Sequence, residues 1–253
     1  MLVKSLLAIL LLLSQGALGA QSNPRSEVED SVLIEKRTEV LKRGESAPAH
    51  RKEALINYPV VTGLKDSAVL QRVQTAVSLK KIFGSSLDEL RAEVKEDWWL
   101  SEIRYQVNYN KHFILDLTFI RSGMGAYPSE MAEHRVINLK TGNLLSASDV
   151  FDPSSLNTLV GMVNQAMQAE VQRKMKEMDK EYRGIVTGDL EGVKFRRKNL
   201  DHFSVSDKGV TFLYDFGFPH AIKALEPSGR YFFSYEKLKA YIKREGLLGP
   251  FVQ

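Results

Sequence analysis

A regular alternation of apolar and polar side chains between Trp98 and Arg121 constrains the fold of this chain more than any other feature. The apolar and aromatic members of the pattern are Ile103, Tyr105, Val107 and Tyr109, and then Phe113, Leu115, Leu117 and Phe119. Because side chains of a strand point alternately to the two faces of a sheet, this pattern predicts a β-hairpin around an Asn110-Lys111 turn. One face is expected to be buried, and Ile114 and Ile120 predict that the other face is also partly covered.

A second hairpin is predicted near the C-terminus. Alternation from Phe203 to Phe216 continues on both sides of a Lys208-Gly209 turn. An irregular crossing, Gly217 to Ile222, separates it from a further extended segment and from a helix expected between Ser234 and Gly246. Serine is a favoured N-cap and glycine a common residue after a helix end, so both ends of this helix carry a signal.

Helices are predicted between these strand pairs. Asp152 is a good N-cap, Pro153 suits the first helical position, and the apolar spacing that follows indicates one long helix near residues 153–180. Upstream, a strand over 54–62 precedes a helix capped by Asp66. Antiparallel strand pairs mixed with separate helices define the α+β fold class.

The first twenty residues have the pattern of a cleavable secretory signal. Lys4 precedes the apolar run Leu6 to Leu13, and small residues from Ala17 to Ala20 offer a cleavage site. The run is too short to span a bilayer comfortably, so a retained membrane anchor is the lesser alternative. We therefore expect the mature protein in the periplasm or outside the cell, with no transmembrane segment after cleavage.

Cysteine is absent from the chain, which excludes disulfides and thiolate chemistry. The net charge of +4 is only a mild excess, and no nucleic-acid-binding motif occurs, so no nucleic-acid partner is predicted. Residues 21–52 are polar and contain Pro24 and Pro48, which favours a tether. A docking helix between Ser26 and Arg43 is the alternative, and the sequence leaves both open.

No catalytic, metal-binding or cofactor-binding constellation is found. The five histidines lie in no metal-ligand spacing, and Gly123-Met124-Gly125 lacks the third glycine of a dinucleotide site. His112 and Asp116, four residues apart on a strand, are expected to face solvent. The sequence therefore favours a non-enzymatic protein. The rival hypothesis is a hydrolase that uses Asp201, His202 or His220, because a histidine beside a carboxylate can act as a general base.

Two segments rich in glycine and proline interrupt the predicted strands, and function is often carried by such loops on a rigid frame. They supply the candidate binding residues, which are Gly123, Gly125, Tyr127, Pro128, Pro219 and His220.

Several motifs resemble the RsiV-type extracytoplasmic domain, which is domain-of-unknown-function family 3298. They are Gly125 to Pro128, Asn138 to Gly142, Asp149 to Phe151, Tyr214 to Ala221 and Gly229 to Leu238. Tyr58 to Leu64 resembles a companion segment, family 4163. One relative in family 3298 is an anti-sigma factor whose outer domain recognises lysozyme, and another is a wall deacetylase with a separate catalytic domain. The family's usual Gly-Gly-x-His is replaced here by Gly125-Ala126-Tyr127-Pro128.

The resemblance implies a two-lobed α+β fold with mainly antiparallel sheets and packed helices. It divides the chain into a signal peptide over 1–20, a tether or docking helix over 21–52, a 4163-like lobe over 53–122 and a 3298-like lobe over 123–253. The implied function is an exported, non-enzymatic binding module of the cell envelope, which recognises a protein such as lysozyme or a wall glycan of the peptidoglycan type. A peptidoglycan-modifying hydrolase, or a domain associated with a deacetylase, is the alternative.

Overall fold

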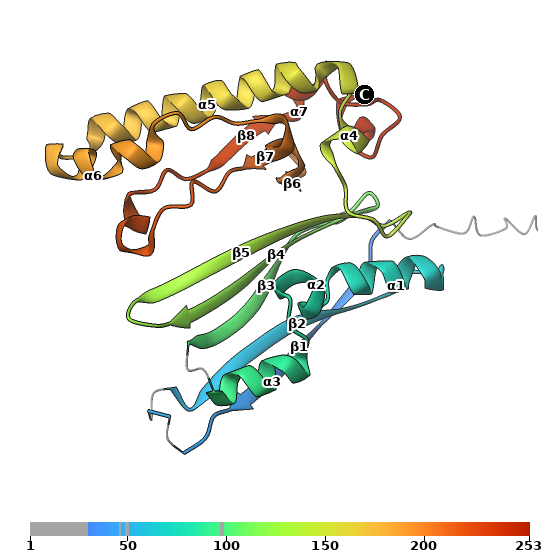
Figure 1. The fold of residues 1–253 in the computed structure, drawn as a ribbon. Helices are drawn as coiled ribbons and strands as arrows, with labels where there is room; N and C mark the ends of the chain where they lie inside the picture. Colours follow the sequence, from blue (N-terminus) through green and yellow to red (C-terminus); the bar gives the residue numbers. More distant parts are fainter. Residues whose placement is uncertain (1–29, 46, 49–50, 97–98) are drawn as a thin grey trace, which may run out of the picture.

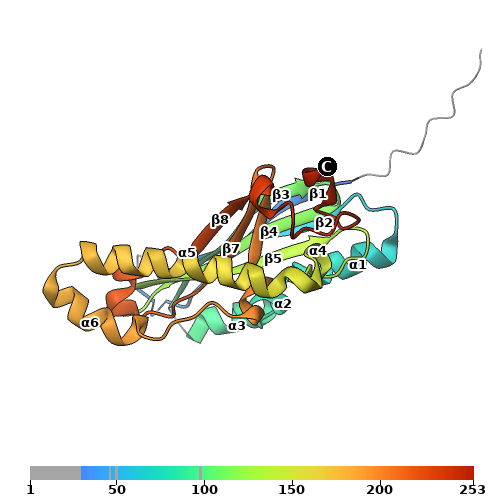
Figure 2. The ribbon, with the colours of Figure 1, turned by 90° about the horizontal axis from the view of Figure 1, so that it is seen from above.

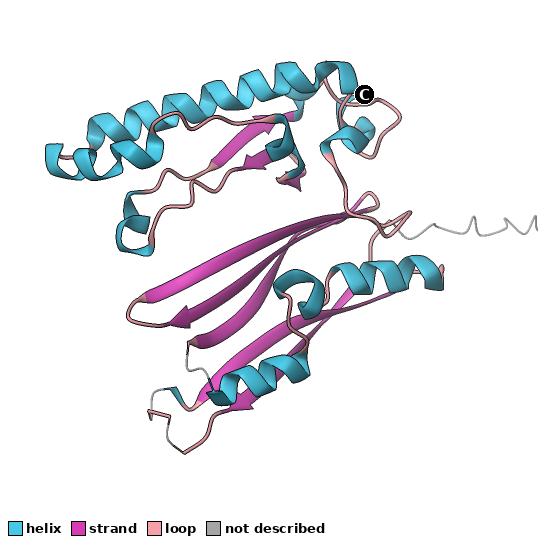
Figure 3. Ribbon diagram, viewed as in Figure 1, coloured by secondary structure: helices cyan, strands magenta, loops and turns pink. Residues whose placement is uncertain are grey.

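The computed structural model describes residues 30–253 apart from residues 46, 49–50 and 97–98. The predicted signal peptide therefore lies outside the described residues. Two layers are present: a five-stranded sheet with short helices on one face, and a three-stranded sheet covered by a long helix (Figure 1). The expected α+β class and the long helix are confirmed, and Figure 3 shows how helices and strands are divided between the layers. No helix in the described part of the chain is long and apolar enough to cross a membrane.

The five-stranded sheet has the order β1-β2-β3-β4-β5. Its strands are β1 (Leu33–Lys42), β2 (Glu53–Thr62), β3 (Leu100–Lys111), β4 (Ile114–Met124) and β5 (Pro128–Asn138). Neighbouring strands are antiparallel except for β2 and β3, which are parallel. A parallel pair needs a long crossover, and here it contains α1 (Ser67–Ala76), α2 (Leu79–Phe83) and α3 (Leu87–Glu96).

These three helices cover one face of the sheet. The predicted cap of α1 is confirmed, because the Asp66 carboxylate accepts hydrogen bonds from the backbone nitrogens of Ala68 and Val69 at 2.9 and 3.0 Å. Val69 and Val73 of α1 pack onto apolar side chains of the sheet, among them Leu115, Leu117 and Phe119. The buried face expected for the first hairpin is therefore the face under the helices.

Residues 21–52 form neither the tether nor the docking helix that the sequence suggested, as far as the structure describes them. Leu33–Lys42 is the edge strand β1, which pairs with β2 along its whole length. The pairing satisfies the backbone groups on one side of the segment, and the Thr38 hydroxyl donates to Oδ1 of Asn57 at 2.8 Å. Leu41 lies in a core cluster with Ile56, so this segment is part of the fold.

The predicted hairpin is confirmed, but its turn and register differ from the prediction. The turn is His112-Phe113, two non-glycine residues with positive φ of 53° and 61°, and not Asn110-Lys111. A register shift between Val107 and Tyr109 adds one residue to β3. Tyr109 consequently points to the face opposite the helices, where it enters the core of the other layer.

The expected lobe boundary between residues 122 and 123 falls inside β4, which continues to Met124. Gly123 pairs with Ser129, and β5 extends the sheet to Asn138. Backbone pairing thus assigns residues 123–138 to the five-stranded sheet, and the chain enters the second layer only after β5.

The second layer contains the three-stranded antiparallel sheet of β6 (Phe203–Ser206), β7 (Gly209–Leu213) and β8 (Arg230–Ser234). Long helix α5 (Leu156–Glu177) buries its apolar stripe against this sheet, and Figure 2 shows it as the outermost element when seen from above. Asp152 caps the preceding turn, as expected, by accepting from the nitrogen of Ser154 at 2.9 Å.

Two helices of this layer differ from expectation. Helix α7 (Tyr235–Leu238) ends well before Gly246, because the chain turns there to bridge Ile242 with Phe151. Helix α6 (Lys180–Leu190) begins where the long helix was expected to end and was not itself predicted. The buried residues of α6 are Val186 and Leu190, so its apolar periodicity is weak among the charged residues and glycines around them.

A candidate binding surface between the two sheets

A buried carboxylate joins the two layers. Asp116 of β4 is 0% exposed, and its Oδ2 accepts hydrogen bonds from the Ser204 hydroxyl at 2.6 Å and from the backbone nitrogen of Val205 at 2.7 Å. Its Oδ1 accepts from Nδ2 of Asn108 at 2.9 Å. One side chain therefore connects β3 and β4 with β6.

The surroundings of Asp116 have two opposing effects on its pKa. Burial raises the pKa of Asp116, because the charged form loses its hydration. The hydrogen bonds from Ser204, Asn108 and Val205, together with the nearby charge of Arg230, oppose this rise. Each of these contacts favours the ionised carboxylate, so Asp116 is held as an acceptor at the contact between the layers.

The hydrogen-bond network continues along the same face of the five-stranded sheet. Asn108 also donates to the Thr118 hydroxyl at 2.8 Å, and that hydroxyl lies 3.0 Å from Nδ1 of His134 on β5. Burial lowers the pKa of His134 to about 4, and the positive charges of Arg230 and other neighbours add to the effect. His134 is thus a neutral imidazole at pH 7.

Cross-strand pairing shows which side chains of the three-stranded sheet face this network. Ser204 is opposite Thr211, and Thr211 is opposite Phe232, so these three side chains share one face. Because Ser204 reaches Asp116, Phe232 is on the face turned toward the five-stranded sheet. Arg230, two residues before Phe232 on β8, points the same way.

The same reasoning identifies the opposing residues of the five-stranded sheet. Thr118 pairs with Gln106 and His134, and Ile120 pairs with Arg104. We call the following set the inter-sheet surface: Arg104, Gln106, Thr118, Ile120, His134, Thr211, Arg230 and Phe232.

The two sides of the inter-sheet surface are not packed against each other throughout. Phe232 is 53% exposed although it faces the other sheet, and Gln106 and Arg230 are exposed as well. Solvent therefore reaches the surface beyond the Asp116 junction.

Two arginines on this surface differ in their partners. Arg104 forms salt bridges with Glu130 at 2.8 Å and Glu102 at 3.5 Å, which raise its pKa. Arg230 has no salt bridge within 4.0 Å to any carboxylate in the described part of the chain. Its guanidinium is the cation of this surface that is available to an anionic group.

Gly123, the first candidate binding residue, is buried against an aromatic side chain. A Cβ at this position would lie 2.3 Å from the carbonyl oxygen of Trp99 and 2.6 Å from its ring. The Trp99 ring is oriented by a hydrogen bond from Nε1 to the Ser129 hydroxyl at 3.0 Å. The geometry gives Gly123 a packing role, because only glycine leaves room for the indole.

Gly125, Tyr127 and Pro128 lie at the tight turn that joins β4 to β5. The nitrogen of Gly125 donates to the carbonyl of Tyr127 at 3.2 Å, and Pro128 already pairs with Met124. The expected interruption of the sheet over residues 123–128 is therefore wrong, since the two strands are continuous up to the turn. The turn itself is exposed, and the Tyr127 side chain is 66% exposed.

Pro219 and His220 begin helix η4 (His220–Leu225), and Pro219 is exposed. The side chain of His220 lies outside what the structure describes. Helix η4 and the β4–β5 turn lie at the same end of the molecule, one in each layer, in both Figure 1 and Figure 2. The structure thus brings the two predicted segments to one end, while Gly123 lies inside the sheet.

The residues of the enzymatic alternative have different surroundings in the fold. Asp201 accepts a hydrogen bond from the nitrogen of Ala147 at 2.8 Å, at the start of helix α4 (Ala147–Val150). His202 is exposed beside β6. Across the residues that the structure describes, no group of three or more histidine and carboxylate side chains is arranged to hold a metal ion.

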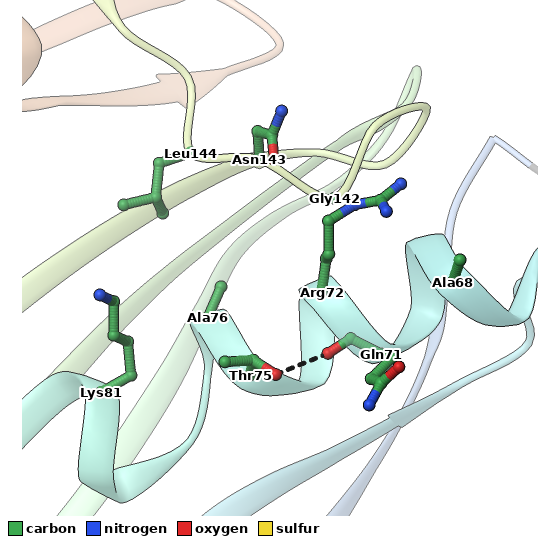
Figure 4. Close-up of a pocket in the computed structure, with 9 residues that line it drawn as sticks. All are labelled: Ala68, Gln71, Arg72, Thr75, Ala76, Lys81, Gly142, Asn143 and Leu144. Carbon is green, nitrogen blue, oxygen red and sulfur yellow. Dashed lines mark hydrogen bonds between the residues drawn. The ribbon is translucent and has the colours of Figure 1, made fainter.

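A separate open pocket of about 370 Å³ lies on the helix-covered side of the five-stranded sheet, between α1, α2 and the turn after β5. Figure 4 shows Arg72 reaching the Gly142 turn, where its Nε donates to the carbonyl of Thr141 at 2.6 Å. Lys81 and the 47% exposed Leu144 lie at the other end of the pocket. The pocket is shallow, and Arg72 is held by its own chain.

The fold, two stacked layers of sheet and helix with the helices on their outer sides, defines a two-layer α+β protein. Among solved structures it resembles a DUF3298 family protein from Pseudomonas aeruginosa PAO1, with a TM-score of 0.57 and 14% identity over 84% of this chain and 94% of that chain. A DUF3298 member from Bacteroides fragilis NCTC 9343 gives a TM-score of 0.56 and 14% identity over 88% and 99%.

At this identity the likeness shows the fold, and it agrees with the family 3298 resemblance of the sequence motifs. The RsiV type and the 4163-like segment stay predictions. No protein-family model and no curated protein sequence matches the chain.

The junction residues were missed by sequence reasoning. Asp116 was interpreted as a solvent-facing partner of His112, whereas it is fully buried. A signal was present, because Asp116 alternates with Ile114 and Ile120 on a face that was expected to be covered. A carboxylate at such a position has to find donors in another element.

Proposed function

We propose that this chain is a member of the DUF3298 family and an exported, non-enzymatic binding module of the cell envelope, located in the periplasm or outside the cell. Its ligand would be an envelope protein or a wall glycan. The observation that carries the proposal is the inter-sheet surface, where Arg230 and Phe232 stay exposed although they face the opposite sheet. The signal pattern of residues 1–20 supports export.

Binding is favoured over catalysis by what the ionisable side chains do. Asp116 is enclosed by its donors, and His134 is engaged with Thr118. Asp201 anchors the start of α4. A general base needs a substrate proton within hydrogen-bond reach, and these groups are directed at other parts of the fold.

The two predicted loop segments suit the rim of such a site. The β4–β5 turn with Tyr127 belongs to one layer, and η4 with Pro219 belongs to the other, at the same end of the molecule (Figure 1). Exposed turns on rigid strands can contact a ligand without disturbing the core.

Affinity capture from envelope extract tests this proposal. We expect the wild type to retain a partner that the Tyr127→Ala, His220→Ala double variant loses. Tyr182→Ala serves as control, because Tyr182 is 49% exposed on α6 and lies outside the proposed rim. Identical partners for wild type and double variant would contradict the role of the loops.

The hydrolase alternative requires its own measurement. Purified protein is incubated with peptidoglycan fragments, and the products are analysed by mass spectrometry. The binding proposal predicts no mass change in the fragments. If the fragments are converted and the conversion is lost in His202→Ala, the binding proposal is wrong and the protein is a hydrolase.

A further inference from the structure

We infer that the inter-sheet surface binds a saccharide that bears a carboxylate, with Arg230 as the carboxylate ligand and Phe232 as the stacking platform. The inference rests on the proposed function and selects the wall glycan over a protein as its ligand. It is carried by the placement of Arg230, which forms no salt bridge in the described part of the chain, beside the exposed ring of Phe232.

The spacing of the two residues fits such a ligand. Arg230 and Phe232 are two positions apart on β8 and share one face of the sheet. Positions two apart on a strand are separated by about 7 Å, which is comparable with a sugar ring plus its acidic substituent. A ring stacked on Phe232 therefore brings its substituent to the guanidinium.

Arg230 is suited to a carboxylate by charge and geometry. A guanidinium can bind both oxygens of a carboxylate through two parallel N–H donors. The neighbouring carboxylate of Asp116 is buried and already accepts three hydrogen bonds. Arg104, by contrast, is neutralised by Glu130 and Glu102. Selectivity for an acidic group is thus expected at Arg230.

The rest of the surface suits hydroxyl and acetamido groups. Phe232 is its exposed aromatic residue, and it offers a flat apolar face to the C–H groups of a pyranose. Thr211 is its cross-strand neighbour, and Gln106 and Thr118 offer further donors and acceptors on the facing sheet. A protein partner would be expected to meet several adjacent apolar or aromatic anchors, and here a single ring lies among polar groups.

Two disaccharides that differ by one carboxylate test the inference. The first is N-acetylglucosaminyl-N-acetylmuramic acid, which carries a lactyl carboxylate, and the second is di-N-acetylglucosamine, which lacks it. Isothermal titration calorimetry with the full mature chain should show at least tenfold tighter binding of the first. Arg230→Gln should weaken the first at least tenfold and leave the second unchanged, while Phe232→Ala should weaken both.

Lys81→Gln is the matched control, because Lys81 is a cation that lines the pocket on the helix-covered side. It should leave both affinities unchanged. Loss of binding in Lys81→Gln with retention in Arg230→Gln would overturn the inference and move the ligand to that pocket. Equal affinity of the wild type for both disaccharides would also overturn it.

Failure of the inference can be told apart from failure of the proposed function. If the wild type binds neither disaccharide but captures a protein that the Tyr127 and His220 double variant loses, the saccharide inference is wrong and the binding function stands. If the disaccharide is converted to products, both are wrong. Arg230 and Phe232 are exposed, so thermal unfolding of both variants should match the wild type and exclude misfolding as the cause.

Discussion

Removal of the Asp116 carboxylate is the sharpest test of how the two layers are held together. In Asp116→Ala the buried nitrogen of Val205 and the hydroxyl of Ser204 lose their acceptor, while Asn108 keeps its bond to Thr118. A buried donor left without a partner costs about 1–3 kcal/mol. Relief from burying a charged group offsets part of this cost. We therefore expect the free energy of unfolding to fall by about 3 kcal/mol.

Asp116→Asn separates the hydrogen bonds from the charge. The amide oxygen can still accept from the nitrogen of Val205 and from the Ser204 hydroxyl, which share one carboxylate oxygen in the wild type, and the bond from Asn108 is the one that is lost. The expected loss is about 1 kcal/mol. Asp207→Asn is the surface control, because Asp207 is 65% exposed in a 3.7 Å ion pair with Lys111. It should change stability by less than about 0.5 kcal/mol.

Urea unfolding followed by circular dichroism gives the three free energies, and hydrogen exchange gives a local readout. Protection of the Val205 amide should fall in Asp116→Ala even under native conditions, because its acceptor is gone. The reasoning is refuted if Asp116→Ala loses less than about 1 kcal/mol and the Val205 amide stays as protected as in the wild type.

Two further predictions follow from single positions. Gly123→Ala should lower the melting temperature by about 5 °C or more, because its Cβ would lie 2.3 Å from the carbonyl oxygen of Trp99. Gly125→Ala is the control and should have little effect, because its Cβ would lie 3.6 Å from the nearest atom. Equal melting temperatures of the two variants would contradict the packing role of Gly123. His134 is neutral when folded and protonates more readily when unfolded, so the stability it contributes is present above its unfolded pKa of 6.5 and is lost as pH falls toward about 4. Since Asp116 has a raised pKa and acts in the opposite direction at acid pH, the measurement is the difference between wild type and His134→Gln, which should shrink by about 3 kcal/mol from pH 7 to pH 4. A difference that is independent of pH would refute it.

Strongly alternating segments were predictable from the sequence, and residues whose environment comes from distant elements were not. The strands around Ile103, Leu117 and Val205 follow from their period of two, and the caps Asp66 and Asp152 follow from local chemistry. These features depend on neighbours within a few positions, so a local pattern is sufficient to specify them.

The edge strand β1 illustrates the opposite case. Leu33–Lys42 is polar enough to resemble a tether, because at the edge of the sheet most of its side chains are exposed. It forms a strand because its backbone pairs with β2, and this pairing cannot be predicted from the residues of the segment itself. The candidate site has the same origin: Arg230 acquires its surroundings only when β8 comes close to β4 and β5, where its charge acts on Asp116 and His134.

The register shift beside Tyr109 adds an apolar contact between the two layers next to the Asp116 junction. By moving to the face opposite the helices, Tyr109 joins Ile114 and Val136 in the core of the second layer. Apolar contact and the Asp116 junction therefore hold the layers together at this end of β4. Toward the β4–β5 turn the same face carries Thr118 and then Ile120, neither of which is fully buried. An unshifted hairpin would have kept Tyr109 under the helices, and the second layer would have lost its ring contact with Phe251.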